Sequence, residues 1–196
     1  GYGNNFGVLY AISQFNPEYL VIMNPDVVVQ PDSIQCCYSV FESDSSIGAV
    51  APIMRNARNE VHKSFAWKHL TFIQECISLS TVFRLVFGKF LQPIYYDIGS
   101  ISKPYQLVDV VPGSLVLFRT RAFLDAGMYD ENMFLFTEER AISKRLLRIG
   151  YTTAICSDSF FMHYHSHTID KALKKYKRHL ISLRSKLYFI QEYTEA

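Results

Sequence analysis

The 196-residue sequence lacks the features that mark membrane-spanning, secreted and disordered proteins. No stretch reaches the roughly 18 unbroken apolar residues of a transmembrane helix, and no basic-then-apolar signal pattern stands at the start. It also has no low-complexity tract and no internal repeat. We therefore expect one packed domain, because this length buries a single substantial core and is short for two.

Cysteine is scarce and the net charge is small. The four cysteines, Cys36, Cys37, Cys76 and Cys156, lack metal-site spacing, and the adjacent pair is a poor disulfide framework. A reducing compartment is therefore expected, and with it a cytoplasmic location. Lys and Arg number 20 and Asp and Glu number 18, for a formal net charge of +2, which gives no reason to expect a nucleic-acid partner.

Hydrophobic spacing predicts several helices. In residues 4–15 apolar side chains recur at helical intervals, with Asn4 or Asn5 available as the N-cap. Asp32 followed by Gln35 forms a capping-box-like start for a second helix. The same kind of pattern predicts helices within the mostly apolar residues 66–91, over a short segment before Gly127, over residues 137–150 with Ile142, Leu146 and Ile149 on one face, and in the basic tail from Lys171 onward.

Short apolar runs predict the strands. "EYLVIMN" (residues 18–24) and "IGAVAP" (residues 47–52) show no polar alternation, which is typical of strands covered on both faces in a parallel sheet. Further strands are expected on either side of Pro112-Gly113-Ser114 and at "YTTAIC" (residues 151–156). Helices that alternate with buried strands indicate an α/β fold, in which a mostly parallel sheet is flanked by helices.

A polar triplet, Asn24, Pro25 and Asp26, follows the first expected strand directly. Ligands bind at the carboxyl ends of strands in open α/β sheets. A carboxylate there can hold Mg²⁺ or Mn²⁺, which keeps its other coordination sites for water and substrate phosphate oxygens. The alternative is a plain turn, because all three residue types are common in turns.

Two glutamates, Glu138 and Glu139, open the helix expected over residues 137–150. Acidic residues in a first turn complement the helix macrodipole, which explains them without any function. A carboxylate in this place that faces a cleft would also suit a general base that accepts a proton from an attacking hydroxyl. Both interpretations stay open on the residues alone.

Alternate histidines occupy "HYHSHT", where an extended backbone would point His163, His165 and His167 the same way. Three imidazoles on one face can bind metal or phosphate, although a solvent-facing edge produces the same alternation. Gly113 is similarly ambiguous, because glycine either allows a bend or lets a substrate approach the backbone.

Four segments together resemble the family 2 glycosyltransferases, in particular the rhamnosyltransferase-like branch that builds bacterial surface polysaccharides. The segments are "GYGNNFG", "YLVIMNPDVVVQPDSI", "VVPGSLVLFRTRAFLDAGMYDENMFLFTEERAISKRLLRIGY" and "MHYHSHT". The resemblance implies a GT-A fold, an inverting mechanism, a nucleotide-diphosphate sugar as donor, and Mg²⁺ or Mn²⁺ as cofactor.

The resemblance also implies roles for four acidic or amide side chains. Asp26 matches the last acidic position of the family's Asp-x-Asp metal motif, whose first position here is Asn24. The family's Glu-Asp pair falls on Glu138 and Glu139, so Glu139 is the candidate catalytic base. In this chain the longer Glu replaces the family's Asp at that position.

Further matches concern the donor and acceptor pocket. Gly113 and Ser114 match the segment that lines the pocket for sugar and acceptor, and Asp130 matches the acidic pair before the catalytic helix. Asp130 would touch the acceptor or order its loop. His163 matches the late histidine that approaches the metal or diphosphate, with His165 as its rival.

One departure from the family concerns the N-terminus. Family members begin with two strands that hold the nucleotide base and ribose, and this chain begins after both. We therefore expect an N-terminally truncated GT-A domain, with residues 1–168 as its catalytic part and residues 169–196 as a C-terminal basic helix. A sheet without these neighbours would expose an edge and an apolar face, so the chain is expected to be poorly stable, or completed by a partner chain.

The expected function is transfer of a sugar to a glycan or lipid-linked acceptor in surface polysaccharide synthesis. Residues 66–91 and the basic tail suit peripheral contact with the inner face of the cell membrane, or are an ordinary core helix and a solvated face. The rival interpretation is a non-catalytic remnant that binds glycan or a partner subunit. A nucleotide-sugar hydrolase is a further alternative.

Overall fold

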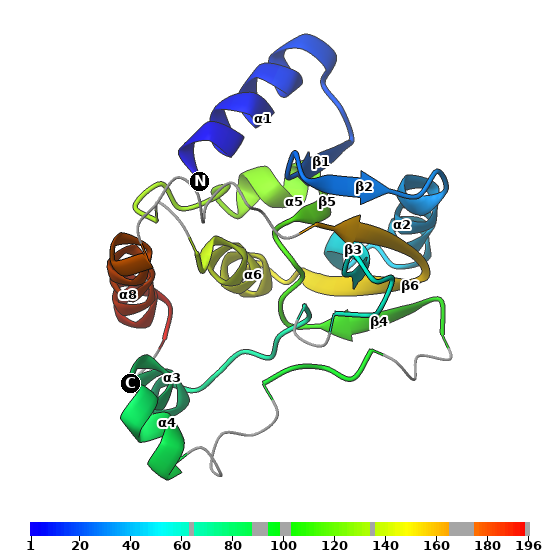
Figure 1. Cartoon of the computed structure of the whole chain (residues 1–196). Helices are drawn as coiled ribbons and strands as arrows, with labels where there is room; N and C mark the ends of the chain where they lie inside the picture. Colours follow the sequence, from blue (N-terminus) through cyan, green and yellow to red (C-terminus); the bar gives the residue numbers. More distant parts are fainter. Residues whose placement is uncertain (63–64, 88–93, 99–102, 134–135, 165–174, 195–196) are drawn as a thin grey trace.

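The computed structural model describes residues 1–62, 65–87, 94–98, 103–133, 136–164 and 175–194. Within these ranges the chain forms one six-stranded sheet with helices on both faces (Figure 1). The α/β class expected from the sequence is therefore confirmed. No helix in the described ranges has the length and apolar content needed to cross a membrane.

The sheet is mixed and mostly antiparallel. Its order is β1-β5-β3-β6-β2, and β4 pairs with β6 as well. Among the described pairings β3 and β6 run parallel, whereas β1–β5, β3–β5, β2–β6 and β4–β6 run antiparallel. The strands are Tyr19–Met23 (β1), Val27–Val29 (β2), Ile47–Arg55 (β3), Tyr105–Val108 (β4), Leu115–Arg119 (β5) and Thr152–His163 (β6).

The expectation of a mostly parallel sheet is thus wrong, and β5 shows why. β5 lies between β1 and β3 and runs against both. Its first four residues are buried, because helices cover both faces of the sheet at this point. An unbroken apolar run therefore reports burial of a central strand, whatever the direction of its neighbours.

β1 also departs from its predicted environment. Leu20 is buried, but Val21 and Met23 are 45% and 56% exposed, so this strand is not covered on both faces. β1 stands at one end of the strand order and pairs with β5 alone among the described strands. It is an edge strand with exposed apolar side chains.

The helices form two layers around the sheet (Figure 1). α2 covers one face, where Cys37, Val40 and Phe41 pack against β3 and β6. α1, α5 and α6 contribute to the larger core on the other face, and α8 packs outside α6. The bounds are Tyr2–Phe15 (α1), Ser33–Ser43 (α2), Phe72–Leu79 (α3), Thr81–Phe87 (α4), Thr120–Asp125 (α5), Glu138–Arg148 (α6) and Lys175–Tyr193 (α8).

Helix ends follow some of the predicted signals. α6 begins after Thr137 and ends before Gly150, whose φ of 87° lies in the left-handed region. Asp32 precedes α2, but its side chain caps nothing because its backbone is already helical, so the predicted capping box is wrong. A capping box forms instead at α3, where Thr71 and Gln74 exchange hydrogen bonds.

Asn5 has a different role from the cap considered for it. It lies inside α1 and is buried, and its side-chain amide donates to the carbonyl oxygen of Tyr129 at 2.9 Å. Its Oδ1 accepts from the backbone N–H of Tyr129 at 3.1 Å. Asn5 therefore fastens α1 to the loop before α6.

Candidate active site

Several candidate residues meet at one edge of the sheet. Because β5 is antiparallel to β1 and β3, and β3 is parallel to β6, the carboxyl ends of β1, β3 and β6 share an edge with the start of β5. Asp26 follows β1, His163 ends β6, and Ser114 immediately precedes β5. This is the edge at which open α/β sheets bind ligands.

Asn24 joins the ends of β1 and β5. Its backbone N–H donates to the carbonyl oxygen of Ser114 at 2.9 Å, which extends the ladder that pairs Met23 with Leu115. Its own carbonyl oxygen accepts from Val27 N–H at 3.3 Å. The polar triplet is therefore a turn, and the turn interpretation holds for its backbone.

Gly113, just before β5, lies against Glu139 in the first turn of α6. A Cβ atom built at Gly113 would lie 3.6 Å from Cβ and 3.7 Å from Oε2 of Glu139. Gly113 does not have a positive φ, so the bend alone does not require glycine here. These contacts place the Glu139 carboxylate beside Gly113, the neighbour of Ser114, whose carbonyl oxygen accepts from Asn24 N–H.

Asp26 and His163 lie on neighbouring chain segments. Val27 pairs with His163 in the β2–β6 ladder, and the carbonyl oxygen of Asp26 accepts from Tyr164 N–H at 3.3 Å. The Oδ1 atom of Asp26 is 3.4 Å from Nε2 of His163. Oδ2 of Asp26 is buried and accepts no hydrogen bond from any residue that the structure describes. Such an oxygen needs a cationic or hydrogen-bonding partner.

These two side chains suit a divalent metal that is completed by a ligand. Within the described residues no group of three or more His, Cys, Asp or Glu side chains is placed to hold a metal. Mg²⁺ is held by one or two carboxylates together with substrate phosphate oxygens and water, so a full protein cage is not needed. The Asp26 carboxylate therefore fits such an ion as part of a site, with the imidazole of His163 3.4 Å from it.

Strained backbone precedes the two glutamates. Phe136 and Thr137 have φ angles of 68° and 64°, in the left-handed region that non-glycine residues rarely adopt. Thr137 is also β-branched, which makes this backbone conformation more costly. Consecutive outliers of this kind persist where surrounding structure enforces them, often at functional sites. Here they set the direction from which Glu138 and Glu139 enter α6.

Glu139 has an unusual electrostatic environment. Burial raises the pKa of its carboxyl group, the nearby Glu138 carboxylate adds to this effect, and its own backbone N–H and Arg140 oppose it. A carboxylate with a raised pKa is a stronger proton acceptor when ionised, as a general base requires.

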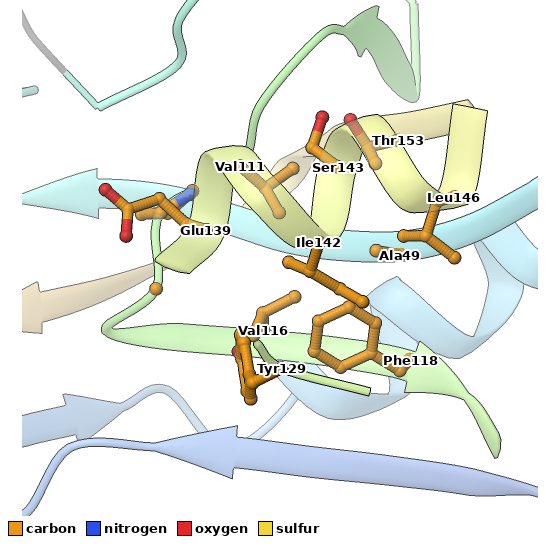
Figure 2. Close-up of a pocket in the computed structure, with 12 residues that line it drawn as sticks. Ala49, Val111, Val116, Phe118, Tyr129, Glu139, Ile142, Ser143, Leu146 and Thr153 are labelled. Carbon is orange, nitrogen blue, oxygen red and sulfur yellow. The ribbon is translucent and has the colours of Figure 1, made fainter. Parts of the chain in front are cut away.

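The Glu139 carboxylate points away from the apolar interior. In Figure 2 it lies at the N-terminal end of α6, while Ile142, Phe118 and Leu146 fill the space between helix and sheet. The cavity among these side chains measures about 10 Å³, room for roughly one water molecule. It is a packing gap, and a sugar would have to bind on the open side of Glu139.

Arg140 is a site-adjacent residue that sequence reasoning missed. Its guanidinium forms a two-pronged ion pair with Glu75 of α3, whose side chain is only 2% exposed. It also stacks on the ring of Phe189 in α8, 4.5 Å from the ring centre. The residue after Glu139 is thereby fixed from two helices, and a partner 65 positions away along the chain leaves no local sequence signal.

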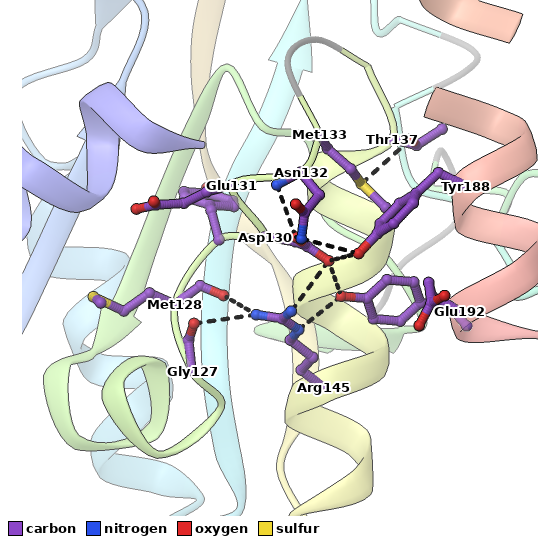
Figure 3. Close-up of polar contacts among 12 residues, drawn as sticks. Gly127, Met128, Asp130, Glu131, Asn132, Met133, Thr137, Arg145, Tyr188 and Glu192 are labelled. Carbon is purple, nitrogen blue, oxygen red and sulfur yellow. Dashed lines mark hydrogen bonds and ion pairs between the residues drawn. The ribbon is translucent and has the colours of Figure 1, made fainter. Parts of the chain in front are cut away.

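Asp130 lies in a different polar cluster (Figure 3). Its carboxylate accepts hydrogen bonds from the hydroxyls of Tyr193 at 2.7 Å and Tyr188 at 3.1 Å, and pairs with Arg145 at 3.2 Å. Burial alone would raise the pKa of Asp130, but these donors and the backbone N–H of Asn132 hold it below its usual value. These contacts fasten α8 to the loop before α6. His165 lies outside the described residues, so its predicted role stays a prediction.

Comparison with known protein families identifies the family of this chain. A family model described as glycosyltransferase-like family 2 matches residues 2–181, nearly the whole chain. The chain belongs to this family. Because the match already begins at residue 2, the predicted absence of N-terminal nucleotide-binding strands stays a prediction.

Curated relatives of this family 2 member are named as rhamnosyltransferases and a hexosyltransferase. Rhamnosyltransferase WbbL of Escherichia coli (strain K12) is 23% identical over 173 residues, covering 85% of this chain and 61% of that protein. The low-salt glycan biosynthesis hexosyltransferase Agl10 of Haloferax volcanii is 23% identical over 79% of this chain and 45% of its own length. An N-acetylglucosaminyl-diphospho-decaprenol L-rhamnosyltransferase of Mycobacterium tuberculosis is 21% identical over 77% of this chain. The chain spans only 45–61% of the length of these relatives.

A solved structure supports the GT-A-like fold. The crystal structure of GalNAc-T7 with UDP, GalNAc and Mn²⁺ matches with a TM-score of 0.56 at 13% identity, covering 84% of this chain and 30% of that one. At this identity the match speaks for the fold alone.

Proposed function

We propose that this glycosyltransferase-family chain moves a sugar, with inversion, from a nucleotide-diphosphate donor to a hydroxyl of a glycan or lipid-linked acceptor in surface polysaccharide synthesis. Support comes from the family match and from the names of the relatives, one of which acts on a diphospho-decaprenol-linked sugar. The observation that carries the proposal is that Asp26, His163 and Glu139 lie at one edge of the sheet. The location proposed from the sequence is the cytoplasm, with peripheral contact to the inner face of the cell membrane as a further possibility.

Asp26 and His163 would hold Mg²⁺ or Mn²⁺ together with the donor diphosphate. The buried Oδ2 of Asp26, without a hydrogen bond from the described residues, supports this role. When bound, such an ion neutralises negative charge on the departing diphosphate. Asn24 and Ser114, joined through their backbones beside this site, would line the donor pocket.

Glu139 would act as the general base. Its carboxylate takes the proton of the acceptor hydroxyl while the hydroxyl oxygen bonds to the anomeric carbon and the bond from that carbon to the nucleotide diphosphate breaks. Gly113, with no side chain, leaves the space next to Glu139 open to the acceptor or the sugar. Glu138 would support this role through its charge, which helps to raise the pKa of Glu139.

Asp130 and His165 are assigned weaker roles in this proposal. Asp130 would order the loop before α6, since Tyr188, Tyr193 and Arg145 already occupy its carboxylate. His165 would approach the diphosphate as an alternative to His163.

The test is Mn²⁺-dependent consumption of a panel of nucleotide sugars by the full chain, with and without an acceptor. Glu139→Gln is expected to lower transfer by about 10²- to 10⁴-fold, the range for loss of a general base. Asp26→Asn is expected to abolish the Mn²⁺-dependent transfer, because it removes the carboxylate that would hold the ion. The matched controls Glu192→Gln and Asp158→Asn change exposed carboxylates away from this edge and should leave the rate unchanged.

Three outcomes would count against the proposal. If the wild type and both site variants all consume no nucleotide sugar while the fold is intact, a non-catalytic glycan-binding remnant would be favoured. Product release that does not depend on an acceptor would indicate a nucleotide-sugar hydrolase. Full activity of Glu139→Gln would remove the assigned base.

A further inference from the structure

The surface of α4 is unusually apolar for an exposed helix. A helix of the core buries its large apolar side chains, and a contiguous exposed group of them marks an interaction surface or a membrane contact. The core-helix interpretation of residues 66–91 therefore does not hold for α4. The exposed fractions are 66% for Val82, 52% for Phe83, 82% for Leu85, 63% for Val86 and 43% for Phe87.

α8 presents a second exposed apolar stripe, flanked by basic side chains. Tyr176, Leu180 and Leu187 are 71%, 37% and 50% exposed and recur at the spacing of one helix face. Lys177 and Arg184 are exposed on the adjoining face. The sequence of α8 contains five Lys or Arg residues and one Glu. An apolar stripe beside a basic face is the pattern of a helix that lies in a membrane interface.

The two helices belong to one side of the molecule. α3 packs against both α4 and α8, and Figure 1 shows these helices together, away from the sheet edge formed by β1. α1 lies at the opposite end of the molecule in this view. We define the docking surface as the exposed apolar side chains of α4 together with Tyr176, Lys177, Leu180, Arg184 and Leu187 of α8.

Side-chain contacts link the helices of this docking surface to the candidate active site. Arg140, next to Glu139, pairs with Glu75 of α3 and stacks on Phe189 of α8. A hollow of about 670 Å³ also opens between α8 and the start of α6, lined among the described residues by Phe136, Tyr176, Arg178, His179 and Ser182. Phe136 lies two positions before Glu138, so this hollow lies near the start of α6.

We propose that the docking surface binds the interface of an anionic lipid bilayer and places α6 toward it. Basic side chains of α8 complement anionic headgroups, and the apolar side chains of α4 enter the boundary with the acyl chains. A second copy of the chain would instead bring two basic α8 surfaces together. Only the consequence for the acceptor rests on the proposed function: a lipid-linked acceptor would reach Glu139 along the hollow beside Phe136.

The test is flotation of the full chain with lipid vesicles at low and high salt. Vesicles of phosphatidylcholine in which about a third of the lipid is phosphatidylglycerol should bind the chain, and pure phosphatidylcholine should bind it on the order of tenfold more weakly. The double variant Leu85→Glu, Val86→Glu should lose on the order of tenfold in vesicle affinity. The matched control Phe6→Glu, Tyr10→Glu, on exposed positions of α1, should bind as the wild type does.

A charge variant provides an independent readout. Lys177→Ala combined with Arg184→Ala should weaken binding to anionic vesicles and reduce its dependence on salt, while leaving the melting temperature unchanged. Absence of vesicle binding by the wild type would overturn the proposal. So would conversion of a dimer to a monomer by the α4 variant, since this would make α4 a contact between copies.

Activity separates this inference from the proposed function. If both hold, the α4 variant should keep its rate on a water-soluble acceptor and lose rate on an acceptor embedded in vesicles. If the chain has no transferase activity, the vesicle-binding results still decide whether the docking surface contacts the membrane.

Discussion

At Glu139, the burial that suits a base also opposes folding. The raised pKa means that the folded state binds the carboxyl proton more tightly than the unfolded state does. Stability therefore falls as pH rises through the folded pKa of Glu139, and the cost of the buried charge is absent below the unfolded pKa. A carboxylate kept at such a cost beside Gly113, at the edge of the sheet that Asp26 shares, supports the proposed role of Glu139 as a base.

This leads to a prediction on stability. Glu139→Gln should raise the melting temperature at pH 8 by roughly 2–4 °C and leave it nearly unchanged at pH 4, since glutamine carries no charge to bury. Thermal unfolding by circular dichroism at the two pH values measures this. Glu192→Gln on the surface of α8 is the control, and an equal shift in both variants would contradict the assignment.

The left-handed backbone conformation of Thr137 leads to a second prediction. Glycine adopts a φ of 64° without strain, so Thr137→Gly should stabilise the fold by about 1 kcal/mol. Transfer should fall at the same time, because the entry of Glu138 and Glu139 into α6 becomes less fixed. Urea unfolding and the transfer assay together measure this. Loss of stability with unchanged transfer would show that the strain has no role at the site.

Single residues were also where the sequence was most informative. Asp26, Glu139 and Gly113 stand at element ends that periodicity can locate, but Gly113 reaches the edge of Asp26 only because β5 runs antiparallel, which the sequence did not predict. The pairing of Arg140 with Glu75 could not be predicted, because it depends on how α3 packs against α6. Nor could the backbone strain at Thr137, which no residue type signals.

Among the elements, α8 is held in part by the buried carboxylate of Asp130. The carboxylate of Asp130 accepts hydrogen bonds from the hydroxyls of Tyr188 and Tyr193 and forms an ion pair with Arg145 (Figure 3). The basic tail predicted as a helix is therefore docked through polar contacts that the sequence pattern did not show. Helix positions were predictable from spacing, whereas strand directions were not, since β5 has the same apolar composition whichever way it runs.

Tyr193→Phe tests this docking. Removing a buried hydroxyl that donates to a charged acceptor should cost about 1.5–3 kcal/mol of unfolding free energy. Because the lowered pKa of Asp130 stabilises the fold above its unfolded pKa, the difference between variant and wild type should shrink as pH falls through the folded pKa. Denaturant titrations at neutral and acidic pH measure both effects. A difference that is independent of pH would contradict the charge-assisted bond.

On the scale of the whole molecule, the two ends expose apolar surface for different reasons. The α4 and α8 end combines apolar with basic side chains. The β1 end exposes Val21 and Met23 on an edge strand, beside α1 with Phe6 and Tyr10 exposed. Such an edge promotes association with other chains.

A charged edge should therefore reduce self-association. Val21→Lys combined with Met23→Lys is expected to lower the concentration-dependent scattering of the chain without a change in its circular dichroism. Light scattering over a dilution series measures this. Unchanged association in the variant would show that the chain does not self-associate through β1.

The central claim is that Asp26 and Glu139 belong to one sugar-transfer centre. The most direct measurement is an anomalous difference map at the manganese edge, from crystals of the full chain grown with Mn²⁺ and a nucleotide diphosphate. The account predicts a manganese peak bonded to Asp26, with the diphosphate between that peak and Glu139. A peak bound elsewhere, or a diphosphate on a surface that Glu139 does not reach, would contradict it.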